Sequence, residues 1–428
     1  MVSHAEVRAW LDATKKRGMA LGLPTTREAL SALGLGTAAF ETVHVAGSNG
    51  KGTVVASLCA ALTLAGVRTL SFTSPHLIRV EERFRLDGVP ADAATVDQAL
   101  AAVQTVEETH NLQLTFFEAT FLVAMWMAHS TNIDVLVLET GLGGRLDATR
   151  VADADVCVLT SLSLEHTDVL GDTLPKIAAE KAAIARPNRP LVVRRPEDEA
   201  VRATIEEHAS MAGSSLLGEP PSPAPLYWVS MEEEQTASEE ALTLARHVWP
   251  HLAATKGLAF PAFQGVQWPA RMHVLPSPRH PNKTYLLDGA HNPSGMDMSC
   301  AELRQRPEIL QGSWALLFGS SPQQEMEAML EPLASLCRSH PPAIVAVTVP
   351  QKGRYPGVEV DEMVRHLENA GIEVNERFSQ PDEAVAWFEA LESEVRTVVS
   401  LGSLYLQGNV MEALGADDQA SLSIRAKV

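Results

Sequence analysis

The hydrophobic and polar positions along the chain follow two periods that alternate. Apolar runs of strand length occur at TVHVA (42–46), VRTLSFTS (67–74), IDVLVLET (133–140) and DVCVLTS (155–161). Between and after them, residues 93–110, 116–129 and 173–185 repeat their apolar positions with helical spacing. Buried β-branched runs separated by helices are typical of a parallel sheet covered on both faces. The first part of the chain is therefore predicted to be an α/β domain.

The same alternation starts again in the last third of the chain. Two proline-rich stretches precede it: residues 216–228, which we expect to be irregular, and residues 276–283, the better linker candidate. Strand-like runs then recur at 283–291, 313–320, 343–349, 373–378 and 396–403. We expect a first domain over residues 1–275, a linker at 276–283, and a second, smaller α/β domain over residues 284–428.

Composition narrows the class of protein. A chain of 428 residues with a formal charge of −19 is too long for one ordinary core and too acidic for a general nucleic-acid binder. The N-terminus has no apolar signal core, and the longest apolar run is about half of what a membrane span needs. Four cysteines lie far apart, so we expect reduced thiols in a cytoplasmic protein with neither membrane nor nucleic-acid partner.

A glycine-rich turn, HVAGSNGKGTV (44–54), lies between the first strand and a helical stretch. Glycines let backbone N–H groups turn toward an anion, and the following helix offers its positive end. Lys51 would lie against the outer phosphates of a nucleotide, and Ser48 or Thr53 could reach a phosphate or a metal. The spacing is shorter than in the usual phosphate loop, so an ordinary tight turn is the alternative interpretation.

Polar side chains end three further apolar runs. Ser74, Glu139 and His166 each come at or just after a predicted strand. In an open parallel sheet, ligands collect at the carboxyl ends of the strands, so these residues facing a phosphate loop predict a magnesium site. Each also has a structural interpretation, as a helix cap, a surface charge and a hydrogen-bonded turn residue. Magnesium prefers oxygen ligands, which makes the imidazole the weakest of the three on chemistry alone.

Taken together, these segments resemble the folylpolyglutamate synthase and dihydrofolate synthase family of the Mur ligase superfamily. The resembling pieces, in order, are HVAGSNGKGT, TSPHLIRVEERFRLDG, LTFFEATFLVAMW, LETGLGGRLDATR, SLEHTDVLGDTLPKIAAEKAAI, WPAR, LLDGAHNPSGM and SLGSLYLQGNV. They cover nearly the whole chain. The resemblance implies an N-terminal P-loop ATPase-like α/β domain and a smaller C-terminal Rossmann-like domain.

The resemblance also implies roles for individual residues. Catalytic roles would fall to Lys51, His166, Arg271 and a carbamylated Lys181. The magnesium ligands would be Ser74, Glu139, His166 and the modified Lys181, which could otherwise be a plain helix-surface lysine. The ATP-binding residues would be Ser48, Asn49, Gly50, Lys51, Gly52, Thr53, Arg271, Asp288 and His291. The pterin-binding residues would be Thr115, Phe116, Phe117, Glu118, Leu146, Asp147 and Ala148, with core packing as the alternative for the two phenylalanines.

The implied reaction is an ATP-dependent amide synthesis. ATP phosphorylates a carboxylate of folate or dihydropteroate, and the amino group of L-glutamate attacks the acyl phosphate; ATP and Mg²⁺ are the cofactors, and we expect a monomer. Ala20 stands where bifunctional members carry Asp, which puts dihydrofolate synthase activity in question, and no adenine-contacting Asn is recognisable. The alternatives are another acid–amino-acid ligase of the superfamily, or a diverged binder of nucleotide or folate without catalysis.

Overall fold

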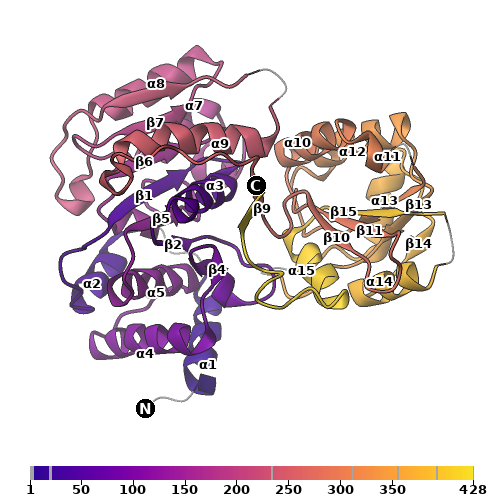
Figure 1. Cartoon of the computed structure of the whole chain (residues 1–428), viewed down its shortest axis with the longest axis horizontal. Coiled ribbons are helices and arrows are strands. Elements are labelled where there is room, and N and C mark those ends of the chain that lie inside the picture. The colour runs from indigo at the N-terminus through magenta and orange to yellow at the C-terminus, as the bar shows by residue number, and fades with distance from the viewer. Residues whose placement is uncertain are drawn as a thin grey trace. The chain divides into compact units, whose positions relative to one another are not determined.

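The computed structural model describes residues 4–18, 22–232, 235–310, 312–353, 356–391 and 394–427. Ala20 lies outside the described residues, so its consequence stays an expectation. The chain forms two compact units, each made mostly of one continuous stretch of the colour gradient in Figure 1. The first contains Met1–His76, Val80–Val266 and Ile424–Val428, and the second contains Leu77–Arg79 and Gln267–Ser423.

An eight-stranded sheet organises the first unit, in the order β4-β3-β2-β5-β1-β6-β7-β8. All neighbours are parallel except the pairs β2–β3 and β3–β4. The strands are β1 (Glu41–Ala46), β2 (Thr69–Phe72), β3 (Phe84–Leu86), β4 (Val89–Pro90), β5 (Val135–Glu139), β6 (Val156–Leu159), β7 (Leu191–Arg194) and β8 (Leu226–Val229). A separate two-stranded sheet pairs β9 (Val266–Gln267) with β16 (Arg425–Ala426).

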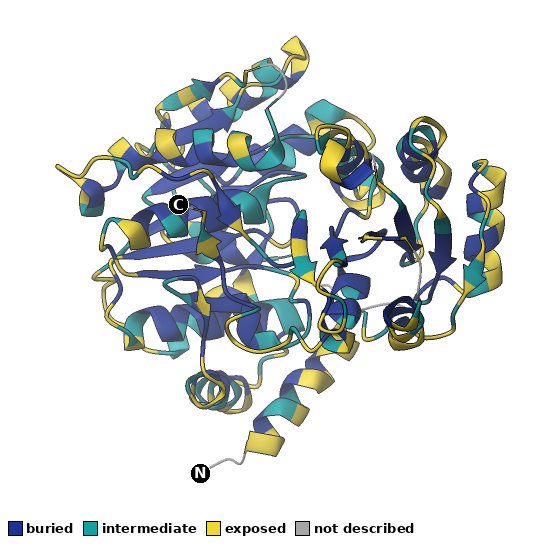
Figure 2. Cartoon of the chain, turned by 45° about the vertical axis from the view of Figure 1, so that its right-hand side comes forward, coloured by how far each residue is buried: buried dark blue, intermediate teal, exposed yellow. Residues whose placement is uncertain are grey.

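Helices cover the sheet because alternate strand residues point to opposite faces. Leu136 and Leu138 of β5 join the core under α1, α2, α4 and α5, while Cys157 and Leu159 of β6 join the core under α7 and α8. The helices are α1 (His4–Thr14), α2 (Pro24–Ala32), α3 (Lys51–Leu64), α4 (Ala93–Thr109), α5 (Phe116–Ser130), α6 (Thr167–Leu170), α7 (Leu174–Ala182), α8 (Glu199–Ser210) and α9 (Ala237–Val248). α3 packs against α9. Figure 2 shows the strands as the most buried layer.

The second unit is built on a six-stranded sheet, β10-β11-β15-β12-β13-β14, parallel except for β10. Its strands are β10 (His273–Pro276), β11 (Thr284–Leu287), β12 (Trp314–Phe318), β13 (Ile344–Val347), β14 (Glu376–Arg377) and β15 (Thr397–Leu401). Its helices are α10 (Pro293–Arg304), α11 (Pro307–Leu310), α12 (Met326–Ser339), α13 (Val360–Asn369), α14 (Pro381–Ala390) and α15 (Leu404–Ala413). Apolar residues of α10 to α13 form one core, and those of α14 and α15 form the other.

The α/β class and the parallel sheets expected from the sequence are confirmed. The expectation that residues 216–228 are irregular is wrong at its end, because β8 begins at Leu226 and pairs with β7. Residues 276–283 contain the end of β10 and the turn into β11. No helix in the described part of the chain combines the length and the apolar character needed to cross a bilayer.

Candidate active site

The carboxyl ends of neighbouring strands meet at one edge of the sheet in the first unit. The register places Val45 of β1 opposite Glu139 of β5, and Ala46 of β1 opposite Leu159 of β6. The glycine loop after β1 therefore starts beside the carboxylate that ends β5, which is where ligands bind in open parallel sheets. Glu139 is 6% exposed, so it is not a surface charge.

Two glycines give the phosphate-loop candidate its conformation. Gly47 has a φ of +147°, and a Cβ at this position would lie 1.8 Å from Oγ1 of Thr160. Gly50, with a φ of +80°, directly precedes α3. The Thr160 hydroxyl donates a hydrogen bond of 2.7 Å to the carbonyl of Asn49. The loop is thus packed tightly against the end of β6, and only glycine fits at residue 47.

The start of α3 has the features of an anion site. The N-cap residue is Gly50, which has no side chain to cap the helix, and the first N–H groups of a helix are a common place for an anion. Lys51 Nζ donates hydrogen bonds of 3.0 Å to the carbonyls of Gly47 and Ser48, which holds the ammonium over the loop. Thr53 lies in the same first turn. The Ser48 hydroxyl is buried and is hydrogen-bonded to the backbone of Ser163.

Lys181 of α7 is also directed at the loop. Its side chain is buried, and Nζ donates to the carbonyl of Gly47 at 2.8 Å and to Oε1 of Glu165 at 2.7 Å. Burial, followed by the charge of Lys51, lowers the pKa of Lys181 to about 8, although Glu165 opposes this shift. A plain helix-surface lysine is therefore excluded, and the amine loses its proton more easily than an ordinary lysine.

Glu165 is a site residue that the sequence analysis missed. Burial raises the pKa of its carboxyl, but Lys181 and Lys51 act in the opposite direction and leave the pKa below its ordinary value. The available signal was its place beside His166, directly after a predicted strand. A single acidic residue in a turn is usually solvated, and only the fold shows that this one balances a buried ammonium.

The predicted magnesium ligands are placed in different ways. The backbone N–H of Ser74 donates to Oε2 of Glu139 at 3.0 Å, so these two residues are adjacent. His166 is exposed, has a φ of 45° and precedes α6. The described residues contain no group of three or more His, Cys, Asp or Glu side chains placed to hold a metal. Of the four predicted ligands, only Glu139 and His166 are of these residue types. This finding therefore does not test the predicted set, which stays a prediction.

Oxygen atoms at this edge fit a hard cation. Glu139 supplies a buried carboxylate, and Ser74, which carries a hydroxyl, donates its backbone N–H to that carboxylate at 3.0 Å. Thr140 Oγ1, next in the chain, is buried and has no hydrogen-bond partner among the described residues. A donor set rich in oxygen matches the preference of magnesium.

Four of the predicted pterin-binding residues form the start of α5. Thr115 and Glu118 make a capping box, and Glu118 also accepts a hydrogen bond of 2.8 Å from Thr26 of α2. Phe117 packs against Gly141, where a Cβ would lie 2.6 Å from its ring. Phe116 and Phe117 are both half-buried and pack against the same core. The structure thus gives Thr115 and Glu118 capping roles and leaves both phenylalanine rings partly accessible.

Cationic side chains surround the Phe116 ring. Lys15 Nζ lies 5.2 Å from the ring centroid, and the guanidinium carbon of Arg83 lies 5.0 Å from it. Arg83 Nε also donates to Nδ1 of His76 at 2.9 Å. Burial, followed by Arg83 and Lys15, lowers the pKa of His76 to about 3, so this imidazole is neutral. An aromatic face beside two cations suits a flat, anionic acceptor.

Leu146, Asp147 and Ala148 lie in the turn that follows β5. One oxygen of Asp147 accepts from the N–H groups of Gly141 and Leu142, both at 2.8 Å, and the other accepts from the backbone N–H of Thr149. Both oxygens therefore stabilise the turn itself. Ala148 is buried and Leu146 is partly exposed. Because the Asp147 carboxylate holds the N–H of Gly141, it also fixes the backbone against which Phe117 packs.

Arg271, Asp288 and His291 lie in the second unit, where they gather around Gly289. A Cβ on Gly289 would be 2.9 Å from Nη1 of Arg271, and His291 Nδ1 is hydrogen-bonded to the Gly289 carbonyl at 2.8 Å. Asp288 accepts hydrogen bonds from the backbone N–H groups of Met272 and Ala290 and from the hydroxyl of Ser299 in α10. The structure therefore places these three residues close together, and their role at the nucleotide stays a prediction.

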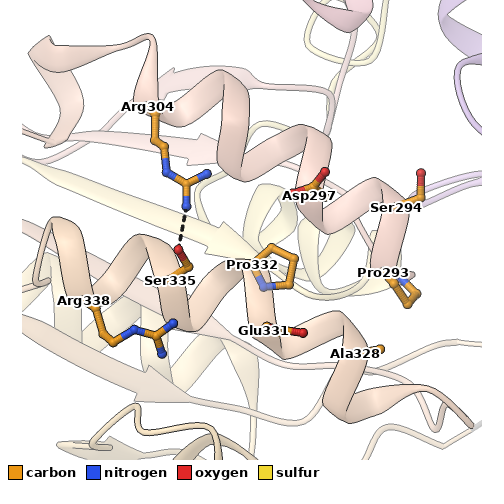
Figure 3. Close-up of a pocket in the computed structure, with 9 residues that line it drawn as sticks. All are labelled: Pro293, Ser294, Asp297, Arg304, Ala328, Glu331, Pro332, Ser335 and Arg338. Carbon is orange, nitrogen blue, oxygen red and sulfur yellow. Dashed lines mark hydrogen bonds between the residues drawn. The ribbon is translucent and has the colours of Figure 1, made fainter.

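A shallow groove of about 600 Å³ lies between α10 and α12. Figure 3 shows that Arg304 points toward Ser335, to which it donates a hydrogen bond of 3.2 Å, while Arg338 and Glu331 extend from α12. The lining mixes both charges on exposed helix faces and contains none of the predicted site residues. We therefore place the candidate active site at the sheet edge and not in this groove.

No protein-family model matches the chain. A curated relative from Bacillus subtilis (strain 168), dihydrofolate synthase/folylpolyglutamate synthase, is 26% identical over 443 residues, covering 96% of this chain and 99% of the relative. The structure of E. coli FolC in complex with DHPP and ADP shares the fold, with a TM-score of 0.79 and 24% identity over 97% of this chain and 99% of that one. A bifunctional folylpolyglutamate synthase/dihydrofolate synthase with Mn, AMPPNP and L-glutamate bound matches with a TM-score of 0.74 and 27% identity, covering 96% and 98%.

The fold and these relatives define an ATP-dependent acid–amino-acid ligase. Within that class, the chain is a homologue of the folylpolyglutamate and dihydrofolate synthases of the Mur ligase superfamily. The resemblance drawn from the sequence motifs is therefore confirmed.

Proposed function

We propose that the protein uses ATP to join L-glutamate to the carboxylate of a folate-type acceptor, with dihydropteroate as a second candidate acceptor. One observation carries the proposal: Lys51, Lys181 and the open start of α3 converge on one glycine loop beside the buried carboxylate of Glu139. Positive groups around a loop, next to oxygen ligands for a metal, fit phosphoryl transfer from a nucleotide. The relative that holds Mn, AMPPNP and L-glutamate supports this assignment.

The reaction then has two steps. The γ-phosphoryl group of ATP passes to an oxygen of the acceptor carboxylate, giving ADP and an acyl phosphate. The amino group of glutamate attacks the acyl carbon, phosphate leaves, and the amine loses a proton to give the amide. Lys51 would bind the transferring group and the loop N–H groups would orient it, which holds donor and acceptor in line.

Magnesium, when bound, would neutralise charge on the phosphoryl oxygens. Ser74, Glu139, His166 and a carbamylated Lys181 are the residues that we infer would hold it. The burial of Glu139 and the lowered pKa of Lys181 support this set. Phe116, together with the turn of Leu146, Asp147 and Ala148, is the proposed pterin contact.

In the second unit, Arg271, Asp288 and His291 are proposed to bind the nucleotide. The guanidinium of Arg271 suits phosphate because its planar fork binds such groups in a bidentate way. Arg271 lies between Ala270 and Met272, whose φ angles of 58° and 43° are rare for residues with side chains. Such strain is often held at functional sites. We further infer a cytoplasmic monomer, and the four buried, unpaired cysteines support a reducing compartment.

An acceptor panel tests the proposal. Purified protein is incubated with ATP, magnesium and glutamate, together with dihydropteroate, dihydrofolate or tetrahydrofolate, and the release of ADP and phosphate is measured. We expect ADP only when both an acceptor and glutamate are present. Turnover that is equal without any pterin would indicate another ligase of the superfamily. Tight nucleotide binding with no ADP in any mixture would indicate a binder without catalysis, and either outcome would overturn the proposal.

A further inference from the structure

The loop after β2 contains three residues that belong to the second unit. Leu77–Arg79 belongs to that unit, although His76 and Val80 on either side belong to the first. Leu77 is 9% exposed and lies in the apolar core formed by α14, α15 and one face of the six-stranded sheet, and Ile78 packs against the same core. We call Leu77–Arg79 the anchor segment. A loop that only joined two elements at the surface would not need to bury an apolar side chain among residues far away in the sequence.

Helix α15 has a glycine at the point where the anchor segment passes. A Cβ on Gly408 would lie 2.4 Å from the carbonyl oxygen of Leu77, 3.0 Å from its carbonyl carbon and 3.5 Å from Cγ1 of Ile78. Glycine within a helix is unfavourable compared with alanine, and this helix continues to Ala413. The close approach of the Leu77 backbone explains why residue 408 is a glycine. A larger side chain at residue 408 would push the anchor segment out of its present position.

The chain on both sides of the anchor segment leads into the candidate active site. Three residues before Leu77, the N–H of Ser74 is bonded to the Glu139 carboxylate. A few residues after the segment, the Arg83 guanidinium lies 5.0 Å from the Phe116 ring. Three residues span at most about 10 Å even when extended. A displacement of the segment therefore reaches Ser74 with little slack in the chain to absorb it.

We propose that the anchor segment, held against Gly408, is a positioning element that sets Ser74 and Arg83 for the reaction. The roles of Ser74 and Arg83 at the metal and the acceptor rest on the proposed function. The new element is that Gly408 and the core around Leu77 hold a segment whose flanking residues in the chain belong to the proposed site. Neither Gly408 nor Leu77 need touch a substrate for this effect.

Gly408→Ala tests the proposal because the added methyl group must move the segment by about 1 Å to reach the 3.4 Å of ordinary contact. A misplacement of that size can reduce a reaction rate roughly 100-fold. We expect the metal concentration needed for half-maximal turnover to rise and kcat to fall roughly 10- to 100-fold. The affinity for ADP, measured calorimetrically, should stay unchanged, because the glycine loop is held by its own contacts with β6. Leu77→Ala, which removes the apolar anchor, should change the same quantities.

Leu414→Ala is the matched control. Leu414 directly follows α15, six residues from Gly408, and lies in the same core. It should lower stability without raising the metal requirement. If Gly408→Ala and Leu77→Ala keep the wild-type metal requirement and kcat, or if Leu414→Ala reproduces their losses, the proposal is wrong.

A second readout separates this proposal from the proposed function. Amide hydrogen exchange around Ser74 should become faster in Gly408→Ala and Leu77→Ala but not in Leu414→Ala, and it needs no turnover. Absence of turnover in the wild type, with this exchange pattern present, would reject the proposed function and keep the anchor. Wild-type exchange in both anchor variants would reject the anchor alone.

Discussion

Replacing Lys181 by methionine removes a buried ammonium and keeps an unbranched side chain in its place. In the native protein, Nζ is held by the Gly47 carbonyl at 2.8 Å and by the Glu165 carboxylate at 2.7 Å, and the side chain is 2% exposed. Burial and the nearby Lys51 lower the pKa of Lys181 from 10.5 to about 8. The variant should therefore change how the stability of the protein depends on pH.

The size and sign of the effect follow from proton linkage. Between pH 10.5 and pH 8 the unfolded chain binds a proton at Lys181 that the folded protein does not. Stability contributed by this residue is thus present above pH 10.5 and is lost as the pH falls to 8. One pKa unit corresponds to about 1.4 kcal/mol, so the shift amounts to about 3 kcal/mol. Below pH 8 the contribution is constant.

The assay is urea unfolding of the wild type and Lys181→Met at several pH values, in buffers free of carbon dioxide. The free energy of unfolding of the wild type, minus that of the variant, should rise by about 3 kcal/mol from pH 8 to pH 10.5. Lys176→Met, at an exposed lysine of the same helix, should show no such rise. A flat difference for Lys181→Met would refute the argument that burial controls this lysine.

Three other substitutions test the loop and the metal site. Gly47→Ala should destabilise the protein by about 2–4 kcal/mol in urea unfolding, because its methyl group overlaps Thr160; a loss below about 0.5 kcal/mol would contradict the packing. Lys51→Ala should abolish glutamate-dependent ADP release with the unfolding midpoint nearly unchanged, and retained turnover would remove Lys51 from the catalytic set. His166→Ala should raise the magnesium requirement; an unchanged requirement would remove His166 from the ligand set.

The sequence was most informative where one local pattern has one structural meaning. Apolar runs of four to eight residues separated by helical periodicity predicted the parallel sheets, because strands buried on both faces are predominantly apolar. Antiparallel β3 and β4 and the short β8 were not predicted. β3 and β4 are only three and two residues long, and β8 follows a proline-rich stretch. Such short strands depend on their neighbours more than on their own composition.

Among the site residues, those of the glycine loop could be predicted, because glycines followed by a lysine between a strand and a helix are typical of a phosphate loop. The role of Glu165 could not be predicted, because it depends on the ion pair with Lys181. Lys181 is 16 residues away in the sequence, and α7 brings it close. The anchor segment could not be predicted for the same reason. The glycine that accommodates it, Gly408, is more than 300 residues away in the chain.

The Glu165–Lys181 pair also makes a prediction about carbamylation. A neutral Lys181 amine that adds carbon dioxide releases one proton and becomes an anion. That anion would lie beside the Glu165 carboxylate, which now accepts a hydrogen bond from the ammonium at 2.7 Å. Two buried anions repel unless a cation lies near them, so magnesium binding and carbamylation should favour each other.

Uptake of isotope-labelled carbon dioxide, measured by NMR, should therefore rise with magnesium concentration in the wild type. In Glu165→Gln, which removes the competing charge, uptake should depend less on magnesium. Lys181→Met serves as the blank for other amines. Equal uptake by the wild type with and without magnesium would mean that the Glu165 carboxylate has moved away from Lys181 before the anion forms. The predicted coupling between magnesium binding and carbamylation would then be wrong.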